Sequence, residues 1–268
     1  MTVPTASDPA HAPPSREGGA RVLELLRVMH RLRGPGGCPW DREQTHESLG
    51  RHLLEEAHET LEAIESGDPD RLRDELGDVL LQVVFHAEMA MQEGRFDIDE
   101  VAAGIIDKLV RRHPHVFGDV QADTSAEVLV NWERIKASEG RRGGRGLDDA
   151  IPRTLPALAR ASKVQRRAAG FGFDWRSSAG AAAKVREELA ELEAAGPDAV
   201  EGETGDLLFA VAALARALGV DPETALRKAT RRFSERFEAM RSDAERQGTD
   251  LSSLTDEELV ARFRAARG

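Results

Sequence analysis

The stretch Lys184-Val-Arg-Glu-Glu-Leu-Ala-Glu191, followed shortly by Glu203-Thr-Gly-Asp206, decides the fold of this chain. Glu188 and Glu191 are three residues apart, and so are Glu203 and Asp206. Residues at this spacing lie about one turn apart on the same face of a helix. The stretch therefore predicts two helices, each with a pair of carboxylates on one face.

A Gly196-Pro197 break between these two segments permits the chain to reverse direction. If the helices pack antiparallel, the four carboxylates converge on one place. Such a cluster, desolvated and unpaired, costs on the order of a few kcal/mol through repulsion and burial, so it favours a bound cation. Because all the ligands are oxygen atoms, the expected ion is Mg²⁺, with Mn²⁺ as the alternative.

The first half of the chain repeats this plan, which indicates a duplicated domain. Three pairs of segments match in the same order: residues 55–59 with 187–191, 75–78 with 203–206, and 108–112 with 228–232. The duplication predicts a second metal site in the first half, with these ligands: Glu55, Glu56, Glu59, Glu75 and Asp78.

Apolar residues recur at helical spacing along most of the chain, and no run with the period of a strand is convincing. In the first half this pattern predicts helices at about 21–33, 45–66, 69–93 and 97–112, whereas the segment Cys38-Pro-Trp-Asp41 is expected to be a loop. Packing helix on helix is the architecture that buries such stripes, so the predicted class is all-α.

The composition of the chain predicts two domains and two connecting segments. Residues 1–20 are rich in Ala, Pro, Ser and Gly, which predicts a disordered tail, and residues 141–147 are expected to form a linker. The two helical domains are then residues 21–140 and 148–268.

The bulk properties exclude several classes of protein. The formal net charge of −11 disfavours nucleic acid as a partner. No apolar run approaches the roughly 20 residues that span a bilayer, so no membrane association is expected. The single cysteine, Cys38, excludes a disulfide framework and fits a reducing cytoplasm.

Basic side chains near the acidic motifs are candidates for binding phosphate groups. They are Lys184, Lys228, Arg231 and Arg232 in the second half, and Lys108, Arg111 and Arg112 in the first. Metal and cations together describe a phosphate pocket. The alternative is a solvated basic helix surface, although repetition of the trio in both halves favours function.

Trp40 and Trp175 each end a Gly-containing loop just before the acidic helix of their half. Either ring can stack on a nucleobase, which makes both candidate substrate-binding residues. The alternative for both is an aromatic side chain that anchors its loop to the core.

Di-iron proteins also build carboxylate sites in helical bundles, from Glu-x-x-His motifs. Glu55 and His58 have that spacing, but all eight histidines lie at or before His115. The second half has no histidine to serve as a ligand, so di-iron chemistry is not what the two halves share.

The acidic pattern resembles the metal motif of the MazG family, which belongs to the all-α nucleoside triphosphate pyrophosphohydrolases. Six further stretches, in the same order, carry the resemblance: residues 37–41, 44–46, 107–117, 131–136, 151–156 and 172–175. The resemblance implies two tandem MazG-like helical bundles packed into a homodimer. It also implies Mg²⁺-dependent hydrolysis of nucleoside triphosphates to the monophosphate and pyrophosphate. The implied role is the removal of unwanted nucleotides from the cellular pool.

On this reading the residues of the second half take distinct roles. Four carboxylates would hold the metal: Glu188, Glu191, Glu203 and Asp206. Glu187 is the candidate to orient or deprotonate the attacking water, and three cations would neutralise the departing phosphates: Lys184, Lys228 and Arg232. The rival hypothesis is a non-catalytic nucleotide-binding or dimerisation protein that retains the acidic motif.

We expect the second half to carry most of the hydrolysis, because Lys184 corresponds to His52 in the first half. A lysine is charged at neutral pH, whereas a histidine of ordinary pKa is mostly neutral. Glu191→Gln should therefore lower kcat by about two orders of magnitude or more, and Glu59→Gln by less than about one. Steady-state kinetics of the two variants measure this, and equal losses would mean that both halves turn over.

Overall fold

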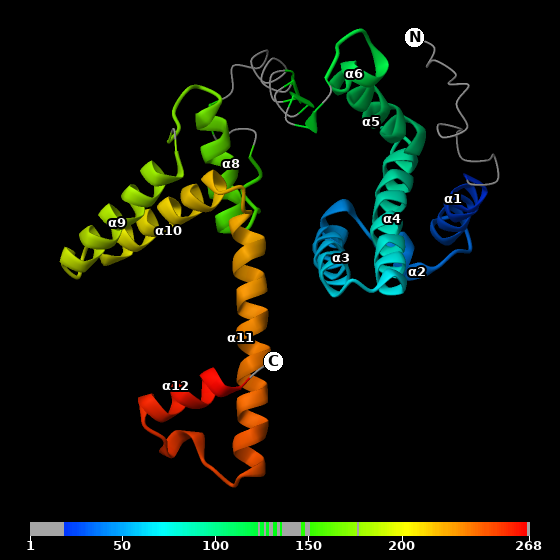
Figure 1. Cartoon of the computed structure of the whole chain (residues 1–268). Helices are drawn as coiled ribbons and strands as arrows, with labels where there is room; N and C mark the ends of the chain where they lie inside the picture. Colours follow the sequence, from blue (N-terminus) through cyan, green and yellow to red (C-terminus); the bar gives the residue numbers. More distant parts are fainter. Residues whose placement is uncertain are drawn as a thin grey trace. The chain divides into compact units, whose positions relative to one another are not determined.

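The computed structural model describes residues 19–122, 151–175 and 177–266, together with positions 124, 125, 127, 128, 131, 132, 135, 146 and 147. Every regular element in these residues is helical (Figure 1), which confirms the predicted all-α class. The chain divides into two compact units, Met1–Lys136 and Ala137–Gly268. The predicted tail and linker fall almost entirely outside the described residues.

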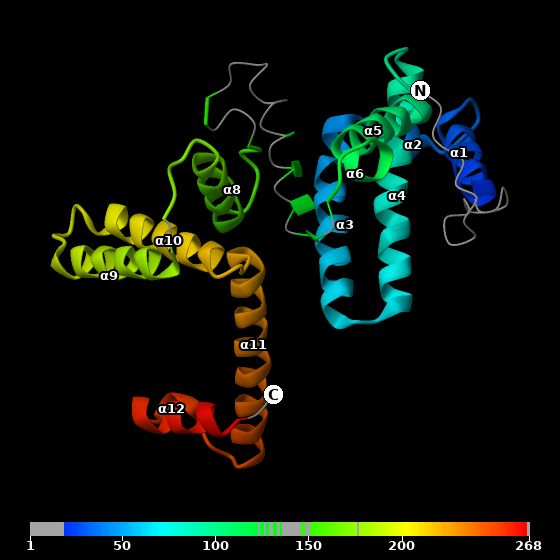
Figure 2. The ribbon, with the colours of Figure 1, turned by 45° about the horizontal axis from the view of Figure 1, so that its top comes forward.

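The first unit is built around two long antiparallel helices, α3 and α4, which lie side by side in both ribbon views (Figures 1 and 2). Helix α1 packs against α4. The helices of this unit are α1 (Ala20–Arg33), α2 (Pro39–Glu43), α3 (His46–Ser66), α4 (Pro69–Gln92), α5 (Ile98–Arg112) and α6 (Pro114–Phe117).

Three consecutive residues, Gly67, Asp68 and Pro69, form the turn between α3 and α4. Gly67 follows α3 with a φ of 71°, a left-handed conformation that glycine adopts without strain. The Asp68 carboxylate accepts hydrogen bonds from the backbone N–H groups of Asp70 and Arg71, and Pro69 occupies the first turn of α4. This turn sets the register in which the two acidic helices face each other.

The segment expected to be a loop, Cys38-Pro-Trp-Asp41, instead leads into the short helix α2. Pro39 lies at the start of this helix, where its missing N–H is not needed and its fixed φ suits a helical turn. The expectation of a loop was therefore wrong, because Pro39 starts a short helix after the glycine-containing turn.

The core of the first unit joins α1, α3 and α4 through five buried apolar side chains. They are Met29, Leu49, Val84, Phe85 and Met89. Leu49 is only 1% exposed, and the chain enters α3 through a capping box in which Thr45 and Ser48 exchange hydrogen bonds. The beginning of α3 is therefore held both by apolar burial and by its cap.

The second unit repeats the antiparallel pair as α9 and α10, and α8 packs against α10 and α11. Both ribbon views show α11 leading away from the α9–α10 pair, with α12 folded back against it (Figures 1 and 2). The elements are α8 (Ala157–Ala169), α9 (Ser178–Ala194), α10 (Val200–Ala217), α11 (Pro222–Arg246), η3 (Leu251–Ser253) and α12 (Asp256–Ala265).

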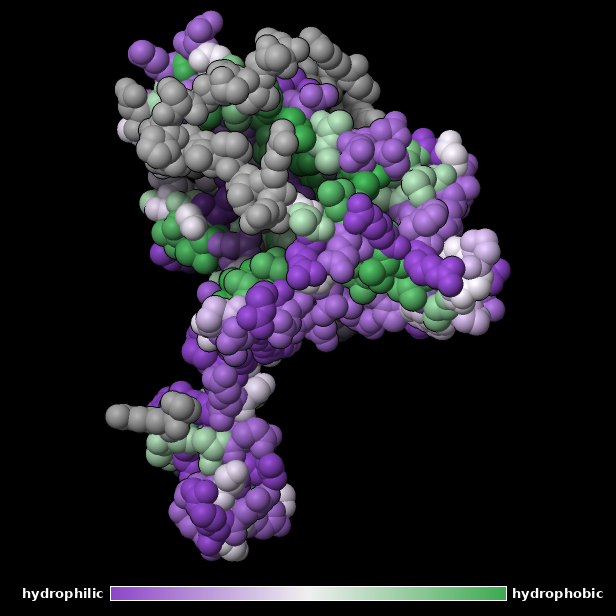
Figure 3. Space-filling model, turned by 90° about the vertical axis from the view of Figure 1, so that its right-hand side faces the viewer, coloured by the Kyte–Doolittle hydropathy of each residue, from purple (hydrophilic) through white to green (hydrophobic). Residues whose placement is uncertain are grey.

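Large apolar side chains remain exposed on both units, and the space-filling view shows apolar surface interspersed with polar surface (Figure 3). On α5 these include Ile105, Ile106 and Leu109, and on α11 they include Leu226 and Phe233. Among the described residues, no helix is long and apolar enough to cross a bilayer.

Candidate metal and phosphate site

The second unit brings three of its four predicted metal ligands together. One carboxylate oxygen from each of Glu188, Glu191 and Glu203 lies within 4.8 Å of the others, with the first two on α9 and the third on α10. Asp206, one turn further along α10, is exposed and lies outside this group. The antiparallel packing of α9 and α10 therefore produces the convergence that the glutamate spacing predicts.

The first unit makes a matching group from Glu56, Glu75 and Asp78, whose ligand atoms also lie within 4.8 Å of one another. Here two of the five predicted ligands, Glu55 and Glu59, lie outside the group and are exposed. Asp78 corresponds to Asp206, and Glu59 corresponds to Glu191. Each of the four positions predicted to hold the metal in the second unit therefore belongs to the group of at least one unit.

Burial and mutual repulsion raise the pKa of one carboxyl group in each unit. Burial and the charges of Asp78, Glu59 and Glu75 raise the pKa of Glu56. In the second unit, burial and then the charge of Glu188 raise the pKa of Glu191. Oxygen ligands that repel one another at this separation fit a divalent cation, which would offset the repulsion.

Lys184 reaches the carboxylates of the second unit directly. Its Nζ lies 2.6 Å from Glu187 Oε1 and 2.7 Å from Glu188 Oε1. Hydrogen bonds to these two glutamates raise the pKa of Lys184, so this lysine carries a charge at neutral pH. Glu188 is only 6% exposed, and a buried carboxylate of this kind needs such a partner.

In the first unit, a histidine takes the place of this lysine. His52 Nδ1 lies 3.1 Å from Glu55 Oε2, and a histidine is charged only when protonated. Both contacts are made one turn before the acidic motif, at the position where the two halves differ in sequence. Glu55 and Glu187 are themselves exposed, in keeping with a role at the surface of each cluster.

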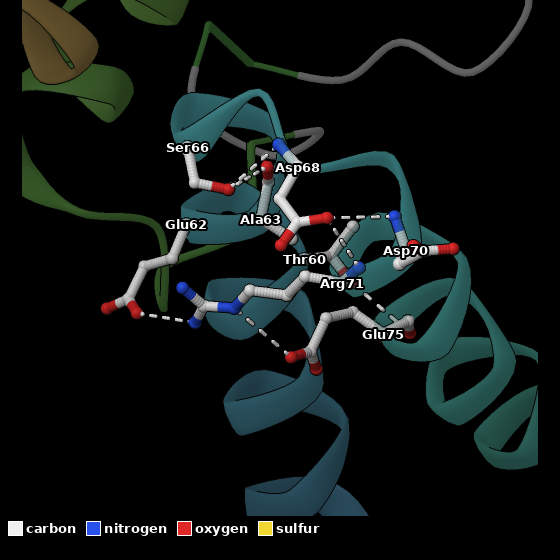
Figure 4. Close-up of polar contacts among 8 residues, drawn as sticks. All are labelled: Thr60, Glu62, Ala63, Ser66, Asp68, Asp70, Arg71 and Glu75. Atoms are coloured by element: carbon white, nitrogen blue, oxygen red, sulfur yellow. Dashed lines mark hydrogen bonds and ion pairs between the residues drawn. The ribbon is translucent and has the colours of Figure 1, made fainter.

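Sequence reasoning missed one cation that lies beside the cluster of the first unit. Arg71 Nε is 3.6 Å from Glu75 Oε1, and Arg71 Nη2 is 3.1 Å from Glu62 Oε2 (Figure 4). The signal was present, because Arg71 and Glu75 are four residues apart and face each other on α4.

Apart from Lys184, the basic residues predicted to contact phosphate in the second unit lie on α11, away from the carboxylates. About 14 residues of α10, or about 21 Å, separate Glu203 from Ala217 at the far end of that helix. Beyond that end, α11 carries Lys228, Arg231 and Arg232 away from the α9–α10 pair (Figures 1 and 2). One copy of the chain therefore does not bring these cations to its own carboxylates.

The first unit has the same arrangement. Lys108, Arg111 and Arg112 lie near the end of α5, which follows the end of α4 that is remote from Glu75. The Arg112 guanidinium lies over the Trp132 ring, 5.6 Å from its centroid, as a cation–π contact.

The two tryptophans expected near the substrate differ in exposure. Trp40 is 52% exposed, and its ring meets the edge of the His52 ring at a centroid distance of 6.4 Å. Trp175 is half-buried, and its Cδ1 lies 3.6 Å from the place that a Cβ at Gly180 would occupy, close to the first turn of α9. Trp175 thus contacts the start of the acidic helix, whereas Trp40 offers an open ring face.

The raised pKa of Glu191 gives a prediction for the protein without metal. A carboxyl group whose pKa is higher in the folded state destabilises that state once it ionises, so its unfavourable effect grows as pH rises above about 4.5. In EDTA at pH 7, Glu191→Gln should therefore have a higher Tm than the wild type, and the difference should disappear below about pH 4.

Thermal unfolding across this pH range measures the effect, with the exposed Glu193→Gln on the same helix as a matched control. Added Mg²⁺ should reverse the order, because only the intact cluster gains stability from the ion. A Glu191→Gln variant that is less stable than the wild type in EDTA would contradict this account of the cluster.

Comparison with known proteins identifies the family of this chain. The model of the MazG nucleotide pyrophosphohydrolase domain matches residues 44–117. The nucleoside triphosphate pyrophosphohydrolase/pyrophosphatase MazG of Thermotoga maritima is 46% identical over 94% of this chain and 98% of its own length. The Escherichia coli nucleoside triphosphate pyrophosphohydrolase is 48% identical over 87% of this chain and 92% of its own. The resemblance inferred from the motifs is confirmed, and the chain belongs to the MazG family.

Proposed function

We propose that this chain hydrolyses nucleoside triphosphates, including deoxynucleoside triphosphates, to the monophosphate and pyrophosphate. The observation that supports this most directly is the convergence of three carboxylates from two antiparallel helices, present in both units. The relatives from Thermotoga maritima and Escherichia coli are named for this activity. A cytoplasmic role in removing unwanted nucleotides fits the activity and the single cysteine.

Glu188, Glu191 and Glu203 would hold the metal ion in the second unit, with Asp206 as the fourth ligand after a change of rotamer. We propose Mg²⁺, with Mn²⁺ as an alternative, because the ligands are all carboxylate oxygens. When bound, the ion supplies a Lewis acid for the phosphate oxygens and lowers the pKa of water.

The side chains around the cluster would activate the attacking water and contact the phosphate groups. Glu187 is exposed beside the metal ligands, where it orients the attacking water and accepts its proton. Lys184 holds Glu187 and Glu188 in the absence of substrate, and it can turn toward a phosphate oxygen when substrate binds. In-line attack at the α-phosphorus releases pyrophosphate as the leaving group.

Lys228 and Arg232 complete the site only if a second copy of the chain supplies them. In one copy, about 21 Å of helix α10 lies between Glu203 and the end from which α11 departs. Exposed apolar residues on α11, such as Leu226 and Phe233, offer surface for burial against another copy. We therefore propose a homodimer in which each α11 brings its cations to the carboxylates of its partner.

The reaction can be tested with a panel of triphosphates and Mg²⁺, with the phosphate products identified. We expect pyrophosphate and the monophosphate, and we expect loss of activity in EDTA that Mg²⁺ or Mn²⁺ restores. Release of orthophosphate from ATP without pyrophosphate would disprove the reaction, and activity that survives EDTA would disprove the role of the metal. Tight binding without turnover would indicate the non-catalytic nucleotide-binding alternative.

Lys228→Ala and Arg232→Ala should each raise KM and lower kcat, because a cation on the departing phosphates acts in both the ground and transition states. Arg241→Ala is the control, since Arg241 lies further along α11 and pairs with Glu238 and Glu245. Wild-type kinetics of both variants over a range of salt would show that this part of α11 is only a solvated basic face.

Mixing two inactive copies tests whether the cations come from a partner. In a mixed dimer of Lys228→Ala and Glu191→Gln, one site would combine intact carboxylates with intact cations. Random pairing should then restore about a quarter of wild-type activity. No recovery after subunit exchange would mean that each chain uses its own cations.

A further inference from the structure

The two acidic clusters differ in the cation that each unit places beside them. In the first unit, Arg71 lies four residues before Glu75, whereas the matching position before Glu203 is Ala199. The second partner of Arg71, Glu62 on α3, corresponds to Ala194 in the second half. Both members of this ion-pair arrangement are thus present in the first unit and replaced by alanine in the second.

The geometry holds the Arg71 guanidinium against the cluster (Figure 4). Its Nε lies 3.6 Å from Glu75 Oε1, and its Nη2 lies 3.1 Å from Glu62 Oε2, so it joins α3 and α4. The Arg71 backbone N–H donates to Asp68 Oδ1 at 3.3 Å, which fixes the start of the helix that carries this side chain. The Glu75 side chain is only 17% exposed, so solvent screens its contact with Arg71 incompletely.

The second unit places its cation on the other helix. Lys184 contacts Glu187 and Glu188 on α9, and the α10 carboxylate Glu203 is preceded by the uncharged Ala199. Both side chains are charged at neutral pH, but a flexible lysine can turn from its carboxylates to a phosphate, whereas an arginine held between two glutamates stays beside them. The two clusters therefore present different electrostatic environments to an incoming divalent ion.

We propose that Arg71 is a resident counter-cation that weakens divalent metal binding by the carboxylates of the first unit. This inference rests on the proposed metal-dependent function and concerns the regulation of the same kind of site. An ion bound to Glu75 would be repelled by Arg71 and would compete with it for a carboxylate oxygen. At the short distance between Arg71 and an ion bound to Glu75, one fixed positive charge weakens the affinity for a divalent ion about tenfold.

The first experiment measures Mn²⁺ binding to the full-length chain by the loss of the free-ion electron paramagnetic resonance signal. Glu188→Gln with Glu191→Gln removes two ligands of the second unit, so that the remaining binding reports the first. In this background, Arg71→Ala should tighten Mn²⁺ binding about tenfold. Arg71→Lys should tighten Mn²⁺ binding less than Arg71→Ala does, because it retains the positive charge but not the guanidinium that joins Glu62 to Glu75.

Arg73→Ala is the matched control. Arg73 lies two residues from Arg71 on α4, but it pairs with Asp70 and Asp74, which are not in the cluster. It should leave the Mn²⁺ affinity unchanged. Circular dichroism of all variants checks that the helices remain folded.

Adding an arginine to the second unit tests whether a neighbouring positive charge weakens metal binding there too. Ala199→Arg places an arginine four residues before Glu203 and should weaken Mn²⁺ binding by the second unit about tenfold in an otherwise wild-type chain. Two results would overturn the inference alone: an Arg71→Ala variant that binds Mn²⁺ no more tightly than its background, and equal tightening by Arg73→Ala.

A different result would contradict the metal site proposed for the second unit rather than the role of Arg71. If Glu188→Gln with Glu191→Gln leaves the tightest Mn²⁺ binding of the chain intact, the carboxylates of the second unit are not the principal metal site. That outcome is separate from a failure of Arg71→Ala, because it appears before Arg71 is changed.

Discussion

Repulsion between carboxylates on two paired helices is the constraint on which both units depend. Apolar contacts and the short reversal between the helices bring Glu188 and Glu203 together, although like charges at this distance oppose the packing. The fold tolerates the repulsion because each unit supplies a compensating cation of its own, Lys184 in one and Arg71 in the other. A divalent ion would relieve the repulsion more fully, so metal binding and helix packing are linked.

Much of this could be predicted from the sequence because it depends on local spacing. The helix boundaries follow from apolar periodicity and from caps such as Asp97 and Asp221, which both accept backbone hydrogen bonds in the structure. The convergence of Glu188, Glu191 and Glu203 follows from two acidic pairs on either side of a turn. These features require only that consecutive helices pack antiparallel.

The features that were not predicted depend on the direction of helices after the paired core. Spacing along the chain places Lys228 and Arg232 on one face of a helix, but it does not reveal that α11 departs from the far end of α10. Spacing along the chain also does not reveal that Asp206 and Glu59 lie outside their groups. The position of Arg71 between Glu62 and Glu75 depends on the packing of α3 against α4, which spacing along one helix does not specify.

The course of α11 has a consequence for the newly made chain. If its cations act on the carboxylates of another copy, a single polypeptide leaving the ribosome carries metal ligands but no complete site. Hydrolysis would begin only when two finished chains meet, so specific activity would depend on how much of the protein a cell contains.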